Sequence, residues 1–185
     1  MSEYQKMISG QLYNALDPEL VQMRKEARTL LARINQNLED LRENHESHAL
    51  CRMLFGAVGK NLWLQPPFFC DYGRNITLGN NVYLNFNCVI LDVAPVKIGN
   101  NVMMGPNVQI YSASHPVDAI ERSRGLELGQ PVTVEDHVWL GGASILCPGV
   151  TVGAGSVIGA GAVVTRDIPP GVLAAGNPAR VIKTL

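Results

Sequence analysis

Aliphatic residues recur every six positions through much of the chain. They form three runs: Leu78, Leu84 and Ile90; Ile98, Met104 and Ile110; and Val134, Leu140, Leu146, Val152, Ile158 and Val164. Glycine often follows the aliphatic residue, and a small or β-branched residue usually stands four positions after it. A period of six fits neither the 3.6-residue turn of a helix nor the alternation of a simple strand. It is typical of short strands joined by tight corners, with three strands in each triangular coil.

The twelve hexads therefore predict an all-β solenoid, a parallel β-helix of about four coils with the large aliphatic residues inside. Neighbouring coils must stack, because one coil cannot bury its own apolar face. Asparagine and glycine permit tight corners, and the pairs Asn80–Asn81 and Asn100–Asn101 are expected at such corners. A chance period in an ordinary β-sandwich would not keep twelve positions in phase.

Two insertions interrupt the hexads. The first, Val93 to Pro95, is short, whereas the second, residues 111–131, is long and polar. We expect the second to protrude from the solenoid. Long loops on a rigid scaffold often carry functional residues.

The first part of the chain has a different pattern. Asp17-Pro18-Glu19 has the residues of a helix start, and apolar residues follow at helical spacing as far as Ile34. A second helix is expected from about Leu38 to Phe55. We therefore expect three parts: a helical cap over residues 1–57, the solenoid over 58–170, and a tail over 171–185 that returns along the solenoid and packs on it.

Composition narrows the class of protein. A chain of 185 residues with 46% hydrophobic and 17% charged residues folds as one domain with a sizeable core. The net charge of −1 predicts neither a nucleic-acid nor an anionic-membrane partner. Four widely spaced cysteines, without a CxxC pair, argue against a disulfide scaffold or zinc knuckle. We expect a reduced, cytoplasmic protein.

Several motifs in the hexad region resemble a known family. The segments LNFN, LDV, SHP, WLGG and GNPAR, together with the hexads, are similar to those of the maltose and galactoside O-acetyltransferases. This resemblance covers nearly the whole chain and lies closest to the maltose enzymes. It implies a left-handed helix, acetyl-CoA as co-substrate, no metal, and a homotrimer with active sites between subunits. The hexads alone predict neither the hand nor the function.

Transfer of an acetyl group to a hydroxyl needs a base, oxyanion donors and a slot for the donor. The resemblance assigns the base to His115, which precedes proline in the long insertion. His45 and His48 on the second helix are interpreted as solvated or interface residues, and His137 as a corner residue. The Gly142 amide is the candidate oxyanion donor. Asn85 is expected to orient the sugar or the base, although this fold also favours asparagine at corners.

The resemblance also predicts residues for both substrates. Asp71, Tyr83 and Asp92 are expected to bind the sugar acceptor, since carboxylates accept from paired hydroxyls. Glu127 either binds the acceptor, orients His115, or is a solvated loop carboxylate. The residues expected at acetyl-CoA are Trp139, Gly142, Ala160, Thr165, Arg166, Arg180 and Lys183.

Three rival functions use the same pattern. A zinc carbonic anhydrase would need three clustered histidines, which the hexads do not offer. A non-enzymatic scaffold would not need the His115 loop. The same chemistry on a non-sugar hydroxyl, such as an antibiotic or amino acid, stays open. Among sugars, we expect maltose or glucose rather than a galactoside, because Asp17 has a helix-capping position instead of an acceptor position.

Overall fold

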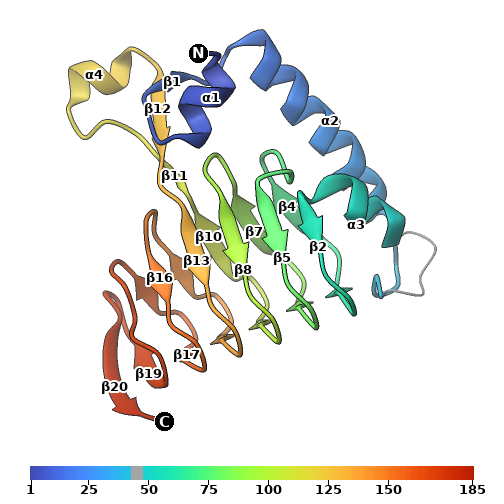
Figure 1. Cartoon of the computed structure of the whole chain (residues 1–185), viewed down its shortest axis with the longest axis vertical. Helices are drawn as coiled ribbons and strands as arrows, with labels where there is room; N and C mark the ends of the chain where they lie inside the picture. The colour runs from blue at the N-terminus through green and yellow to red at the C-terminus, as the bar shows by residue number, and fades with distance from the viewer. Residues whose placement is uncertain (43–47) are drawn as a thin grey trace.

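The computed structural model describes residues 1–42 and 48–185. Its main body is a three-sided parallel solenoid (Figure 1). Each side is named here by its first strand. The β2 face contains β2 (Ala57–Val58), β5 (Ile76–Leu78), β8 (Val96–Ile98), β13 (Val132–Val134) and β16 (Thr151–Val152). The β3 face contains β3 (Trp63–Leu64), β6 (Tyr83–Leu84), β9 (Met103–Met104), β14 (Trp139–Leu140), β17 (Val157–Ile158), β19 (Val172–Ala175) and β20 (Arg180–Thr184). The β4 face contains β4 (Phe68–Cys70), β7 (Cys88–Leu91), β10 (Gln109–Tyr111), β15 (Ile145–Leu146) and β18 (Val163–Val164).

The predicted core positions are confirmed. All twelve aliphatic residues of the hexads are buried, with exposed fractions of at most 2%. A further coil precedes them, because Val58, Leu64 and Cys70 pair in register with the first three hexad positions. The solenoid therefore has five coils rather than four. Val58, Leu64 and Cys70 are themselves six positions apart, and the step of eight from Cys70 to Leu78 equals the step from Ile90 to Ile98. The sequence therefore carried the signal of the extra coil, which the prediction missed.

The predicted asparagine corners are also confirmed. Asn81 and Asn101 have φ values of 56°, in the left-handed region that asparagine tolerates better than most residues. Their side chains form a ladder: Asn61 donates to Asn81 and Asn81 donates to Asn101, each at 2.8 Å. The ladder follows the corner between the β2 and β3 faces and ties successive coils together.

Helices cover the open end of the first coil, as predicted. Helix α2 (Pro18–Asn35) begins at its N-cap Asp17, whose carboxylate accepts from the Glu19 N–H at 3.0 Å. Its last residue, Asn35, exchanges two 2.9 Å hydrogen bonds with the backbone of Phe68 on β4. Two further elements, α1 (Glu3–Ile8) and β1 (Tyr13–Asn14), precede it and were not predicted.

The second predicted helix is partly wrong. Helix α3 spans only His48–Leu54, and residues 43–47, which include His45, lie outside the described residues. Leu41 is not helical: its backbone pairs with Leu64 on β3 through hydrogen bonds of 2.8 and 3.0 Å. Pairing with an open strand edge therefore outweighs helix propensity at this position. His48 is 3% exposed, which corrects the expectation of a solvated or interface side chain.

The long insertion has its own secondary structure. Strand β11 (Ala113–Ser114), helix α4 (Ala119–Ser123) and strand β12 (Leu126–Gly129) form a hairpin that leaves the corner between the β4 and β2 faces. Strand β12 also pairs antiparallel with β1, so the hairpin joins the cap (Figure 1). No helix in the described ranges has the length and apolarity to cross a membrane.

The end of the chain extends one face. Strand β19 runs parallel to β17, and β20 turns back antiparallel along β19. The expected tail therefore forms a hairpin at the last coil and does not return along the earlier coils.

Candidate active site

Six of the predicted site residues line two separate pockets within one chain. One is a pocket of about 230 Å³ beneath the cap, here called the cap pocket, lined by Ala15, Leu16, Arg24, Arg28, Asp71, Tyr72, Val93 and Glu127. The other is a groove of about 270 Å³ on the β3 face, here called the face groove, lined by Tyr83, Asn85, Met103, Met104, Gly105, Pro106, Trp139 and Gly142. The two share no residue.

Two of the predicted acceptor residues meet in the cap pocket. Asp71 follows β4 at the corner from which the hairpin leaves, and Glu127 comes from β12 of the hairpin itself. Burial, together with the Glu127 charge, raises the pKa of Asp71. The Tyr13 hydroxyl donates to Glu127 at 2.7 Å, and burial raises the pKa of this phenol, which keeps its proton.

Two arginines in the same pocket were missed in the sequence. Arg24 donates to the Tyr72 hydroxyl at 2.7 Å and to the Ala15 carbonyl at 2.6 Å. Arg28 lies one helical turn further along α2, and both guanidinium groups face the Asp71 charge. Their spacing of four residues on a predicted helix was the available signal. Two carboxylates and two guanidinium groups suit a ligand rich in hydroxyls, because they offer both acceptors and donors.

Asp92 is not in the pocket, which corrects its predicted contact with a sugar. Its side chain is fully buried, and its carboxylate accepts from the backbone N–H groups of Asp71, Tyr72 and Asn75 at 2.9–3.3 Å. Burial raises its pKa to about 7, although these hydrogen bonds oppose the shift. Asp92 therefore supports, from behind, the turn that carries Asp71.

His115 follows the end of β11, next to Ser114, which pairs with Leu128 on β12. It lines neither the cap pocket nor the face groove, and its side chain is exposed. His137 sits at a corner with a φ of 61°, away from both sites.

The face groove gathers four other predicted residues. Trp139 points outward from β14 and is 51% exposed, beside Met103 in register. Asn85 and Gly142 lie where the β3 face turns into the β4 face. The Asn85 side-chain oxygen accepts from the Phe86 N–H at 2.8 Å, so its amide nitrogen can face a ligand. Among the described residues, the Gly142 N–H has no hydrogen-bond partner, as an oxyanion donor requires.

Close packing explains the glycines at this corner. A Cβ on Gly141 would come within 2.6 Å of the Ala160 nitrogen in the next coil. Small residues at this corner therefore allow successive coils to pack closely, and no large side chain projects from the surface there. The exposed Ala160 continues the face groove toward the C-terminal end of the solenoid.

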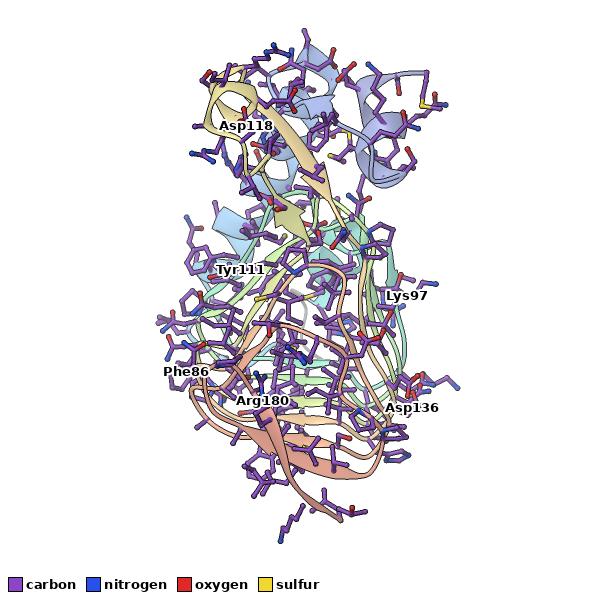
Figure 2. The ribbon with its side chains drawn as sticks, turned by 90° about the vertical axis from the view of Figure 1, so that its left-hand side faces the viewer. Phe86, Lys97, Tyr111, Asp118, Asp136 and Arg180 are labelled. Carbon is purple, nitrogen blue, oxygen red and sulfur yellow. The ribbon has the colours of Figure 1, made fainter. Side chains whose placement is uncertain are left out.

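The remaining residues predicted to bind acetyl-CoA lie on an edge strand and at a corner. Arg180 and Lys183 lie on β20 at the edge of the β3 face, with Lys183 in register with Leu173. Thr165 and Arg166 follow β18, at the corner from which the hairpin leaves. A single chain therefore does not bring all of them together. Figure 2 labels Arg180 in the lower half of the solenoid.

Metal chemistry has no evident site here. In residues 1–42 and 48–185, no three His, Cys, Asp or Glu side chains are arranged to hold an ion.

Known proteins match this chain over its whole length. The model of the maltose acetyltransferase hexapeptide capping motif matches residues 6–59, and that of the hexapeptide repeat of succinyl-transferase matches residues 131–166. The galactoside O-acetyltransferase of Escherichia coli is 40% identical over 98% of this chain and 88% of its own length.

Solved structures of acetyltransferases are also similar to this chain. A maltose O-acetyltransferase from Clostridium difficile has a TM-score of 0.97 and 49% identity, covering 100% of this chain and 98% of its own. A hexapeptide-repeat acetyltransferase from Vibrio cholerae, solved with acetyl coenzyme A, has a TM-score of 0.92 and 40% identity, covering 100% and 99%.

Proposed function

The chain belongs to the maltose and galactoside O-acetyltransferase family, with its left-handed parallel β-helix, and on that premise we propose that it acetylates a sugar hydroxyl. Acetyl-CoA is the donor, and the acceptor is a sugar of the maltose or glucose type. The observation that carries the proposal is the cap pocket, where Asp71 and Glu127 face Arg24 and Arg28. Glu127 belongs to the same hairpin as His115. Asp17 caps α2, which supports the maltose type over a galactoside.

The chemistry requires one base and one oxyanion site. The neutral His115 imidazole takes the proton as the sugar oxygen attacks the thioester carbon. The Gly142 N–H stabilises the oxyanion, with Asn85 orienting the sugar or the base. The C–S bond then breaks, and the coenzyme A sulfur receives the proton from the imidazolium. The products are the sugar ester and the free thiol.

The cap pocket and the face groove lie apart within one chain, so they form one site only if chains associate. Outward side chains on the β4 face are mostly apolar: Phe69, Val89, Gln109, Ile145 and Val163. Those on the β2 face are mostly polar: Ala57, Thr77, Lys97, Thr133 and Thr151. The β3 face also carries exposed apolar side chains, but Met103 and Trp139 there line the face groove. The apolar β4 face therefore supports a homotrimer with the β4 faces around the threefold axis, because large apolar surfaces are usually covered.

Such a trimer would complete the site between neighbours. The β4 face extends from the corner of the hairpin, near Tyr111, to the corner of Phe86 and Gly142 (Figure 2). Around a threefold axis, the hairpin corner of one subunit adjoins the Phe86 corner of the next. His115 of one chain then reaches the face groove of its neighbour.

The donor would lie along that groove. Its thioester end sits at Trp139 and Gly142, and its arm passes the small Ala160 towards Arg180 and Lys183, whose charges suit phosphates. Thr165 and Arg166 of the adjoining subunit lie at the corner that meets this groove. Free thiols at all four cysteines support a cytoplasmic location.

The test is an acceptor screen that measures thiol release from acetyl-CoA. Maltose and glucose are expected to react faster than galactosides and non-sugar alcohols. His115→Ala should lower kcat by about 10²–10⁴-fold, the usual contribution of a positioned base, with an unchanged Kd for coenzyme A.

His137→Asn is the matched control, because asparagine occupies the equivalent corner at Asn101, and it should keep full activity. Near-normal turnover by His115→Ala would remove the base from the proposal. A preference for an antibiotic or amino-acid hydroxyl would replace the sugar while keeping the chemistry.

A further inference from the structure

A chain of hydrogen bonds connects the cap to the face groove. The Tyr83 hydroxyl donates to Gln65 Oε1 at 2.7 Å, and Gln65 Nε2 donates to Asp40 Oδ1 at 3.1 Å. The other oxygen of Asp40, Oδ2, accepts from Trp63 Nε1 at 2.9 Å. Of these four residues, only Tyr83 lines the face groove.

The direction of each bond follows from chemistry. A carboxylate can only accept, so the amide nitrogen of Gln65 must face Asp40. The amide oxygen of Gln65 is then turned to Tyr83, which must give it the single hydrogen of the phenol. Tyr83 therefore meets a ligand in the face groove with lone pairs alone. Burial and the Asp40 charge raise the pKa of Tyr83, so the phenol keeps this hydrogen.

Packing holds the same group in place. The rings of Trp63 and Tyr83 lie 4.8 Å apart, and the Arg42 guanidinium lies 3.8 Å from the centre of the Trp63 ring. Arg42 is also 3.7 Å from Asp40 Oδ2. The pairing of Leu41 with Leu64 fixes the backbone between Asp40 and Arg42 on the β3 face.

We propose that Asp40 and Gln65 are positioning residues that present the Tyr83 oxygen as a hydrogen-bond acceptor for a donor group of the sugar acceptor. The proposal rests on the proposed function, and it adds a specificity element that comes from the cap. A ligand that places a hydroxyl hydrogen at Tyr83 is favoured. A ligand that places only an ether or carbonyl oxygen there is rejected, because two acceptors would face each other.

The test is a double-mutant cycle on Gln65 and Tyr83. Tyr83→Phe removes one oxygen and should raise the acceptor KM by about three- to tenfold, the usual value of one neutral hydrogen bond. Gln65→Met frees the phenol and should raise the same KM, with kcat and the acetyl-CoA KM within about twofold of wild type. In the Tyr83→Phe background, Gln65→Met should add nothing, because it acts only through that hydroxyl. Asp40→Ala is expected to follow Gln65→Met in both backgrounds.

Gln22→Met is the matched control. It removes a comparable bond, from Gln22 Nε2 to Glu26 Oε1 at 2.9 Å on the exposed side of α2, and should change neither KM. Additive effects of Gln65→Met and Tyr83→Phe would overturn the proposal. So would a normal acceptor KM in Tyr83→Phe, or a rise confined to the acetyl-CoA KM, which would assign the Tyr83 oxygen to a pantetheine amide. If the wild type acetylates no sugar, the proposed function fails instead.

Discussion

Single residues show how position changes the role of a carboxylate. Asp92 is buried behind the cap pocket, and burial raises its pKa to about 7. Asp136 lies half-buried at a corner of the solenoid, where hydrogen bonds from Asn100 lower its pKa. The family resemblance predicted a ligand-binding role for Asp92, because the spacing of the motif does not show which way a side chain points. Only the fold shows that its oxygens face backbone amides.

The titration of Asp92 predicts a pH dependence of stability. Its pKa rises from 3.8 in the unfolded chain to about 7 in the folded one, so between these values the folded protein binds more protons. Stability from this group should therefore fall as the pH rises from about 4 to about 7, by roughly 1.4 kcal/mol per unit of pKa difference. The Asp92→Asn variant lacks this titrating group. Its stability relative to wild type should therefore increase as the pH rises over that range.

Denaturant unfolding of both proteins between pH 5 and pH 8, at one protein concentration, measures this difference. Asp136→Asn is the control, because a pKa lowered from 3.8 contributes stability that is lost only below about pH 4. Its profile should therefore parallel that of wild type between pH 5 and pH 8. Parallel pH profiles for wild type and Asp92→Asn would contradict the prediction.

Among the helices and strands, some are specified by the local sequence pattern and others by pairing with a distant segment. The hexad strands, their corners and the start of α2 at Asp17 agree with the sequence, since each depends on residues close in the chain. The segment at Leu41 does not, because its partner Leu64 is on β3. The hairpin of β11 and β12 was predicted only as a protruding loop, since its strands are too short to show a pattern.

The asparagine ladder gives a prediction for one element. Asn81→Ala should destabilise the solenoid by about 2–3 kcal/mol, because alanine is strained at a φ of 56° and the ladder bonds are lost. Asn81→Gly tolerates this φ and should lose only about 1 kcal/mol. Thermal unfolding at a fixed protein concentration should rank wild type first and Asn81→Ala last. An Asn81→Gly variant as unstable as Asn81→Ala would show that backbone strain contributes little here.

At the scale of the whole molecule, the split between cap pocket and face groove is the central feature. Every coil passes the same three faces, so residues at equivalent corners line up although they are far apart in the sequence. Asp71, the hairpin that carries His115, and Arg166 share one corner, whereas Asn85, Gly142 and Ala160 share another. These two corners lie apart within one chain, whereas the proposed trimer would bring the first corner of one subunit to the second corner of its neighbour.

A substitution on the β4 face tests that assembly. Ile145→Arg puts a charge at the centre of the proposed interface, and it should yield a folded monomer with activity at least about 10²-fold lower. Thr133→Arg is the matched control, at the equivalent outward position of the same coil on the β2 face, and should stay trimeric and active. Light scattering reports the mass and circular dichroism the fold. A monomeric Ile145→Arg variant with full activity would refute an interfacial site.

The repeat, the buried aliphatic residues, the asparagine corners and the capped helix could all be predicted from the amino-acid sequence. These depend on side-chain size and backbone preference within a few residues, which spacing records directly. The burial of Asp92, the meeting of Arg24 and Arg28 with Asp71, and the link from Asp40 through Gln65 to Tyr83 became visible only in the folded chain. Each of these depends on which distant segments meet when coils stack beneath a cap, and that geometry leaves no period in the chain.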